Sequence, residues 1–293
     1  MIKIAQNFSS KSGAVRRCAF SLIEILVTVA LLSVIILGLV AMFNQTRRAF
    51  TSSMTQVDVL EAGRTAADLI ARELEQMTAS SAGGVCNFFV DTPTTYNNPI
   101  LQPLTDPNDI KTNNLQEVYF LTRNNQQWSG IGYRLTNYAD GIGTLFRYSS
   151  NNIPFTSNSI LYNLTNYFTN TVVPGPNFSR LIDGVVDFRV RAYNTNGVLL
   201  PQMTNSGRTI LIQTNVTTGE YTLDVFNNGA LPAYVEVELG VLEDRALARY
   251  QALSVGGTGP GTPARAYLAS HAGQVHIFRQ RIPIRNVNPA AYP

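Results

Sequence analysis

The sequence predicts an α+β fold in which one long amino-terminal helix precedes a mostly antiparallel β-sheet domain. Three observations support this prediction: an uninterrupted apolar run near the amino terminus, a following stretch whose apolar residues recur every three or four positions, and a series of short strand-like runs separated by turn signals. The chain has 293 residues, of which 45% are hydrophobic, so it is long enough for one large domain or two small ones.

The apolar run, Phe20–Phe43, is the most informative segment. Its only polar side chains are those of Ser21, Glu24, Thr28 and Ser33. A helix of this length extends about 36 Å, which is enough to cross a hydrocarbon core of roughly 30 Å. Few soluble proteins bury a helix that is apolar on every side, so the run is predicted to span a membrane.

Flanking charges predict the orientation of this span. Four basic residues precede it, whereas Arg47 and Arg48 follow it, so the amino-terminal end is expected in the cytoplasm and residues 44–293 are expected to be exported. A secretory signal peptide would have a shorter apolar region of about 7–15 residues and a small-residue cleavage site, to which Leu39 and Ala41 are a poor match. A plain single-span anchor is the simplest alternative.

Glu24 is the feature that a plain anchor does not explain. A charged side chain costs roughly 2.5–3.5 kcal/mol at the bilayer centre on insertion scales, and somewhat less near the edge. No neighbouring side chain is basic, so the carboxylate needs a partner from elsewhere. Cleavage just before Phe20 would create a free α-amine at the same depth.

The string Arg16-Arg17-Cys18-Ala19-Phe20-Ser21-Leu22-Ile23-Glu24 resembles the class III signal of type IV prepilins. That family has a basic leader, a small residue before the cut, Phe at the first mature position and Glu at the fifth. The resemblance implies cleavage between Ala19 and Phe20 by a membrane-embedded prepilin peptidase, methylation of the Phe20 amine, and retention of the apolar helix. It also implies that Glu24 pairs with the α-amine of a neighbouring subunit during filament assembly, which neutralises two charges that are each costly in hydrocarbon. Ala19 departs from the usual Gly, so processing is expected to be slower.

The helical pattern continues beyond the apolar run. From Asn44 to about Ser80, apolar residues recur at helical spacing and charges fill the gaps, so we expect one helix from Phe20 to about Ala79 that ends at Ser80–Gly84. Its second half is predicted to be amphipathic and to pack on the following domain. The expected apolar stripe consists of Phe50, Met54, Val57, Leu60, Ala67, Ile70, Leu74 and Met77.

The rest of the chain reads as strands and loops. Residues 85–114 are rich in Asn, Pro and Thr and are predicted to form a surface loop, in which Asp106, Asn108 and Asp109 lack an EF-hand spacing. A short helical turn is expected within Val241–Leu253, and a Gly- and Pro-rich loop at Gly256–Pro263. The predicted strands are Val118–Arg123, Ile131–Leu135, Gly143–Tyr148, Val185–Tyr193, Arg208–Asn215, Tyr221–Val225, Tyr234–Leu242 and His276–Ile284.

Several strand sequences extend the resemblance. Segments 132–135 with 145–147, 181–189, 231–237 and 281–286 are similar to strands of J-type minor pseudopilins and W-type minor pilins, and residues 42–77 are similar to the Verru/Chthon cassette protein C family. The resemblance implies a pilin-like fold. The expected domains are a cytoplasmic leader (1–19), a transmembrane or filament-core helix (20–43), an amphipathic continuation (44–80) and a β-rich exported domain (81–293).

The resemblance implies a structural function. The expected protein is a minor pilin or pseudopilin subunit near the tip of a type II secretion pseudopilus or type IV pilus-like filament. Its size is well above that of a typical major pilin, which fits a low-copy subunit. Its expected partners are the prepilin peptidase, other pilin or pseudopilin subunits, an inner-membrane assembly platform and the lipid bilayer. The alternative is a membrane-anchored exported binding module or adhesin that does not assemble.

Composition argues against other classes. The chain has 22 basic and 19 acidic residues, and once the four basic leader residues are set aside acidic residues outnumber basic ones by one, so no nucleic-acid footprint is expected. Two cysteines exclude a disulfide framework. No G-x-S-x-G, Walker A, H-E-x-x-H or Rossmann motif is present, so no catalytic residue, metal or cofactor is predicted.

The remaining candidates have ordinary structural interpretations. His271 and His276 are expected on opposite faces of a strand, and Glu236 and Glu238 on one solvent-facing side of another rather than as a catalytic carboxylate pair. Cys86 would be alone in the mature chain, where it is either buried or paired with another chain.

Overall fold

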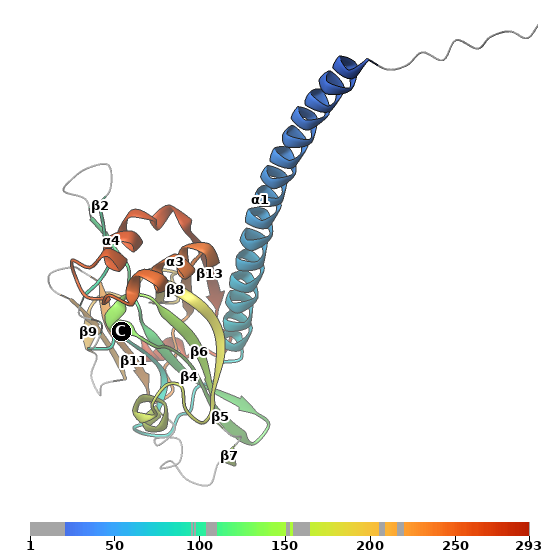
Figure 1. Ribbon diagram of the computed structural model, residues 1–293. Coiled ribbons are helices and arrows are strands. Elements are labelled where there is room, and N and C mark those ends of the chain that lie inside the picture. Colours follow the sequence, from blue (N-terminus) through green and yellow to red (C-terminus); the bar gives the residue numbers. More distant parts are fainter. Residues whose placement is uncertain are drawn as a thin grey trace, which may run out of the picture. The chain divides into compact units, whose positions relative to one another are not determined.

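The computed structural model describes residues 21–94, 96, 98–103, 110–150, 153–154, 165–204, 209–215 and 220–292. The chain divides into two compact units, Met1–Ser53 and Met54–Pro293, and each is described by itself. Figure 1 shows one long helix and a domain built around a sheet. The predicted α+β arrangement is confirmed, with an apolar amino-terminal helix and an antiparallel sheet that are consistent with a pilin-like fold.

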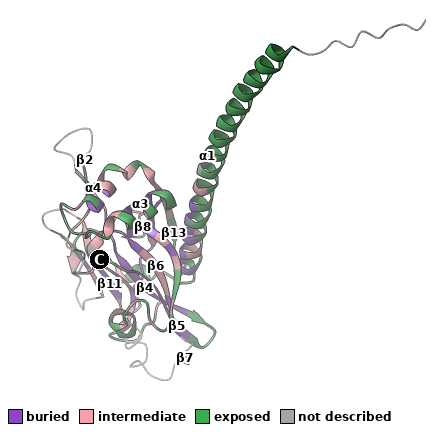
Figure 2. Cartoon of the chain, viewed as in Figure 1, coloured by how far each residue is buried: buried purple, intermediate pink, exposed green. Residues whose placement is uncertain are grey.

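Helix α1 (Leu22–Glu75) has two different halves. In its first half every described residue is exposed, including the aliphatic side chains, as the green colour in Figure 2 shows. In its second half one side is buried against the sheet, and the buried residues recur at the three- and four-residue spacing of a helix face. These residues are Val59, Gly63, Ala66, Ala67, Ile70, Glu73 and Leu74.

The predicted apolar stripe of the helix is therefore buried only in part. Ile70 and Leu74 are fully buried, whereas Met54 and Val57 are 66% and 56% exposed. The helix also ends at Glu75, four residues before the predicted end. It ends there because the chain turns into contact with the sheet, where Thr78 N donates to Leu121 O at 2.9 Å.

The main sheet has 11 strands among the described residues, and all its recorded pairings are antiparallel. From edge to edge it contains β13 (Val275–Pro283), β12 (Tyr234–Leu242), β8 (Phe178–Tyr193), β6 (Gly143–Ser149), β5 (Gln127–Leu135), β4 (Glu117–Asn124), β1 (Cys86–Asp91), β11 (Tyr221–Asn227), β10 (Ile210–Thr214) and β9 (Met203–Thr204), with β7 (Ile153–Pro154) paired to β5. Each of the eight predicted strands corresponds to one of these, and Tyr234–Leu242 has the predicted bounds.

Turn chemistry accounts for several of the strand connections. Asn228 and Gly229 follow β11 with φ values of 52° and 84°, a backbone conformation that Asn and Gly adopt more readily than other residues. Asn125, between β4 and β5, also has a positive φ, 55°. These turn residues of the sequence therefore lie where the strands reverse. In the register of β5 and β6, Tyr133 lies directly opposite Arg147.

The prediction of a surface loop at residues 85–114 was wrong in part. Cys86–Asp91 forms β1, which lies inside the sheet between β4 and β11. Phe88 and Val90 of this strand belong to the core, and Asn87 is fully buried, where its side chain bonds Ser80 and Ala230. The same region also contains a separate two-stranded hairpin, β2 (Leu101–Pro103) and β3 (Ile110–Thr112).

Both faces of the sheet are covered. Alternation places Val118 and Phe120 of β4 in the core beneath α1, and Tyr119 and Leu121 in a second cluster on the other face. That second face also carries α3 (Asp244–Ser254) and α4 (Pro263–Ser270), which pack on residues such as Val186 and Leu242. The structure also contains the short turns η1 (Tyr138–Asp140), η3 (Ala272–Gln274) and η4 (Pro289–Ala291), and residues 165–170 are helical. Helix α4 was not predicted: it begins at Pro263, the last residue of the predicted loop, and lies before the predicted last strand.

Candidate functional site: the start of the apolar helix

The first turn of α1 is closed by a reciprocal pair of hydrogen bonds. Ile23 N donates to Ser21 Oγ at 3.3 Å, and Ser21 N donates to Glu24 Oε2 at 3.1 Å. This is a capping box, in which a Ser and a Glu three residues later satisfy backbone amides that the helix leaves unpaired. The S-x-x-E spacing of Ser21 and Glu24 is the sequence signal for this capping box.

The capping box places the Glu24 carboxylate at the beginning of the helix rather than along its side. A negative charge is favoured at this end because the helix dipole is positive there. One backbone amide donates to this carboxylate, and the residue is otherwise exposed. The carboxylate therefore retains acceptor capacity for a further donor.

The other polar side chains of the apolar segment are satisfied within the helix. Thr28 Oγ1 donates to Ile25 O at 2.9 Å, and Ser33 Oγ donates to Val29 O at 2.8 Å. Such bonds let hydroxyl groups enter hydrocarbon at low cost. Among the described residues α1 is the one helix long and apolar enough to cross a membrane, and Glu24 is its one ionisable side chain before Arg47.

The other predicted site residues, Ala19 and Phe20, lie outside the described residues. The cleavage site, the methylated amine and the pairing of Glu24 with a neighbouring amine therefore stay predictions. The structure places Glu24 in the first turn of the helix, next to the predicted cut.

A second cluster, missed by the sequence analysis, joins the second half of α1 to the sheet. Glu73 is 8% exposed and lies over the facing pair Tyr133 and Arg147. Arg147 Nη2 is 2.5 Å from Glu73 Oε1, Arg147 Nε is 2.9 Å from the same oxygen, and the Tyr133 hydroxyl donates to Glu73 Oε2. The carboxylate thus fixes the position of this part of the helix over β5 and β6.

Gly63 sets how closely the helix approaches β13. A Cβ at this position would lie 2.2 Å from Cε2 of Phe278, so the ring packs directly on the helix backbone. One turn further on, Gln280 Nε2 donates to Asp68 Oδ1 at 2.7 Å. Gly63 lies within the buried face of the helix, and Asp68 and Glu73 make their polar contacts on opposite sides of it.

The predicted solvent-facing side of β12 is in fact an ion-pair ladder. Glu236 and Glu238 do share a face, but Glu238 is 3% exposed. Arg279 Nε is 3.0 Å from Glu238 Oε2, and Arg191 Nη1 is 3.1 Å from Glu236 Oε1. Burial alone would raise the pKa of Glu238, but hydrogen bonds and charge from Arg279, with the charge of Arg189, hold it below its usual value. Because Glu236 and Glu238 are each bonded to an arginine, their arrangement does not favour the interpretation as a catalytic carboxylate pair.

The prediction for the two histidines was wrong. His271 caps the end of α4, where its ring stacks on Tyr267, and lies before β13. His276 is on β13, with Nε2 3.2 Å from Glu243 Oε1. Within the part of the chain that the structure describes, no three His, Cys, Asp or Glu side chains come together as metal ligands.

Cys86 is a free cysteine whose Sγ lies 3.5 Å from Phe88 O. Burial raises the pKa of its thiol to about 12, against smaller opposing effects of hydrogen bonds with the Thr165 side chain and with the Phe88 carbonyl, which accepts from Sγ. Because the thiolate is the reactive form, we expect Cys86 in the folded protein to react with a maleimide at pH 8 at least about a hundredfold more slowly than in urea. Both rates are measured in a Cys18→Ser variant, in which Cys86 is the single thiol of the sequence. Equal rates in the two conditions would contradict this prediction, and no reaction in either condition would indicate pairing with another chain.

Comparison with known proteins supports the interpretation of the amino terminus. Residues 15–40 match the family described as Prokaryotic N-terminal methylation motif. This match supports a type IV prepilin-like class III signal and a pilin- or pseudopilin-type precursor that is processed by prepilin peptidase and assembles with other pilins. No curated protein and no solved structure gave a match to the chain.

Proposed function

We propose that this protein is a minor pilin or pseudopilin subunit, anchored in the inner membrane by residues 20–43 until it is incorporated into a filament. The observation that carries the proposal is Glu24, a carboxylate in the first turn of an exposed apolar helix, inside the segment that matches the methylation motif. The proposed orientation leaves residues 1–19 in the cytoplasm and exports the β-rich domain. The proposed segments are the leader 1–19, the apolar helix 20–43, its amphipathic continuation 44–80 and the domain 81–293.

The exposed first half of α1 supports assembly. A helix whose aliphatic residues are all exposed needs another apolar environment, which lipid supplies in the membrane and other helices supply in a filament. Release from lipid requires that the charge of Glu24 be neutralised at the same depth. A methylated α-amine at Phe20 of a neighbouring subunit provides the matching cation.

The domain supports a low-copy position. Within the described residues it comprises a sheet of 11 strands with helices on both faces, a large structure for a repeating shaft subunit. We therefore propose a position near the tip of a type II secretion pseudopilus or type IV pilus-like filament. The proposed partners are other pilins or pseudopilins and the inner-membrane assembly platform.

The mature amino terminus is the first test of this proposal. Mass spectrometry of protein taken from its native membrane should show a chain that begins at Phe20 with a methylated amine. A chain beginning near Met1 would indicate a plain anchor, and one beginning near Met42 would indicate secretory cleavage. Either result would overturn the proposal and favour the alternative of an anchored binding module or adhesin.

Changing Glu24 to Ala is expected to leave membrane insertion intact but to reduce recovery in sheared filaments by at least about tenfold, because an unpaired amine in hydrocarbon costs more than 1.4 kcal/mol. Ser33→Ala is the matched control, since it removes a polar group from the same segment whose hydrogen bond is internal to the helix. Immunoblots of membrane and filament fractions measure both outcomes. Normal filament recovery of Glu24→Ala would remove the pairing argument.

A further inference from the structure

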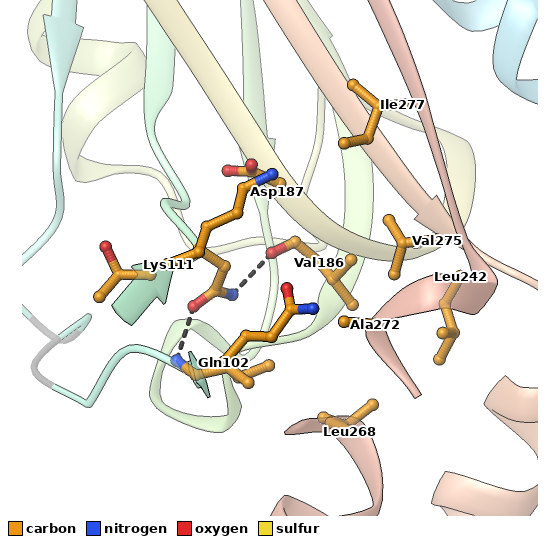
Figure 3. A pocket seen from close by; sticks show the side chains of 12 residues that line it. Gln102, Lys111, Val186, Asp187, Leu242, Leu268, Ala272, Val275 and Ile277 are labelled. Atoms are coloured by element: carbon orange, nitrogen blue, oxygen red, sulfur yellow. Dashed lines mark hydrogen bonds between the residues drawn. The ribbon is translucent and has the colours of Figure 1, made fainter. Parts of the chain in front are cut away.

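A small apolar hollow lies on the face of the sheet opposite α1. It has a volume of about 80 Å³. Val186, Leu242 and Val275 contribute aliphatic side chains from three adjacent strands, and Leu268 of α4 closes one side (Figure 3). The β2–β3 hairpin forms another side of the hollow. No part of the candidate site at the start of α1 contributes to it.

Gly240 lets two wall residues of the hollow approach each other. In the sheet register Gly240 of β12 lies between Asp187 of β8 and Ile277 of β13. A Cβ at Gly240 would lie 3.0 Å from Asp187 Cβ and 3.2 Å from Val275 Cγ1, both of which belong to residues lining the hollow. The two preceding rows of the same face carry Glu238 and Glu236. The absence of a side chain at Gly240 therefore lets Asp187 and Val275 pack closely between the ion-pair ladder and the hollow.

The walls of the hollow are fixed by satisfied polar groups. The Asn113 side chain accepts from Ile100 N at 2.6 Å and donates to Val186 O at 2.6 Å, and these bonds are drawn in Figure 3. Asp187 is held by Arg189 Nε at 3.0 Å and by Asn114 N at 2.9 Å. The Asn113 amide and Asp187 Oδ1 are therefore held in place by other groups of the protein.

Two donors at the same hollow have no partner among the described residues. Lys111 is exposed and has no ion pair within the described residues, and the Gln102 amide has no hydrogen-bond partner there. The hollow thus combines an aliphatic interior with a cation and an amide donor, and the Asp187 carboxylate in its wall is bonded to Arg189. This combination favours an anionic acceptor attached to an apolar group.

Size limits the ligand. A cavity of 150 Å³ holds benzene, and sites for drug-sized ligands occupy about 300–1,000 Å³. We propose that the hollow binds a short aliphatic carboxylate, with a branched group of about four carbons in the hollow and the carboxylate at Lys111 and Gln102. This chemistry belongs both to free short-chain acids and to the carboxyl end of a polypeptide whose last residue is aliphatic.

The test uses the full chain in lipid nanodiscs, with empty nanodiscs as the blank. Equilibrium dialysis would compare 3-methylbutanoate, its neutral amide, an acetylated tetrapeptide ending in Leu with a free carboxylate, and the same tetrapeptide amidated. We expect at least one acid to bind and its amide to bind at least about tenfold more weakly. Binding of 3-methylbutanoate alone identifies a free acid as the source, and binding of the tetrapeptide acid identifies a chain end.

Variants assign the binding to this hollow. Lys111→Gln is expected to weaken binding by about tenfold, and Ala272→Leu, which fills the hollow from η3, is expected to abolish it. Arg249→Gln removes an exposed charge from α3 and should change nothing. Thermal melts confirm that each variant is folded. The proposal is overturned if no acid binds, if acid and amide bind equally, or if binding persists in both Lys111→Gln and Ala272→Leu.

Discussion

Changing Glu73 to Ala is expected to lower the free energy of unfolding of the sheet domain by about 3–5 kcal/mol, the range measured when one partner of a buried ion pair is removed. Glu73 is 8% exposed, and Arg147 and the Tyr133 hydroxyl both bond its carboxylate. Its loss would leave a partly buried guanidinium and a buried phenol without their acceptor. The second half of α1 would then lose its polar attachment to β5 and β6.

Urea unfolding of the full chain in detergent measures this effect. The single tryptophan, Trp128, is 5% exposed in β5 and reports unfolding of the sheet by fluorescence. Glu75→Ala is the matched control, because Glu75 lies two residues further along α1 and its nearest cation, Arg285 Nη2, is 4.0 Å away at the surface. The control should cost no more than about 1 kcal/mol. A Glu73→Ala loss equal to that of the control would show that the cluster does not stabilise the domain.

A double-mutant cycle separates the ion pair from general packing. If Glu73 and Arg147 act through each other, the loss in Glu73→Ala/Arg147→Ala should be smaller than the sum of the two single losses by about 1–3 kcal/mol. Additive losses would assign the effect to packing of the helix rather than to the pair.

The sequence allowed the helix and most of the strands to be predicted because their signals are local. Alternating apolar residues predict the strand Tyr234–Leu242 without knowledge of the strands that pair with it. Glu24 can be recognised as unusual because its neighbours along the chain are apolar. The strand Cys86–Asp91 was missed because Asn, Pro and Thr dominate the residues after it, although Phe88 and Val90 alternate as a core strand should.

What could not be predicted depends on groups that are distant in the sequence. Glu73 lies on the buried face of α1, but its acceptor role requires Arg147 and Tyr133, which the register of β5 and β6 brings together. Glu238 likewise appeared to be a solvent-facing residue, because only the pairing of β12 with β13 places Arg279 beside it. Periodicity indicates which face of an element a residue occupies, but it does not show which charge lies opposite.

Asp224 shows the same limit in a more extreme form. On β11 it shares a face with Phe226, and its neighbours across the sheet are Val90 on β1 and Ile212 on β10, both of which are core residues. Asp224 is 1% exposed, and neither of its carboxylate oxygens has a hydrogen-bond partner among the described residues. A carboxyl group in such surroundings keeps its proton, because the charged form would lose its hydration without gaining a partner.

Burial raises the pKa of Asp224 from its usual 3.8 to about 8. The sign of the effect on stability follows from the proton balance. Below the unfolded pKa both states are protonated and ionisation costs nothing, whereas between that value and about pH 8 the unfolded state releases the proton that the folded state retains. Stability therefore falls as pH rises through this window, by up to about 1.4 kcal/mol per pH unit.

Asp224→Asn is therefore expected to stabilise the protein increasingly from pH 4 to pH 8, with a relative gain of a few kcal/mol at the upper end. The measured quantity is the difference in free energy of unfolding between variant and parent at each pH, because titration of all other groups cancels in that difference. Asp58→Asn is the control, since Asp58 is exposed on α1 and its difference should stay flat. A gain that does not change with pH would mean that Asp224 is ionised in the folded protein. Its carboxylate would then require a cation that the surrounding core residues, Val90, Ile212 and Phe226, do not provide.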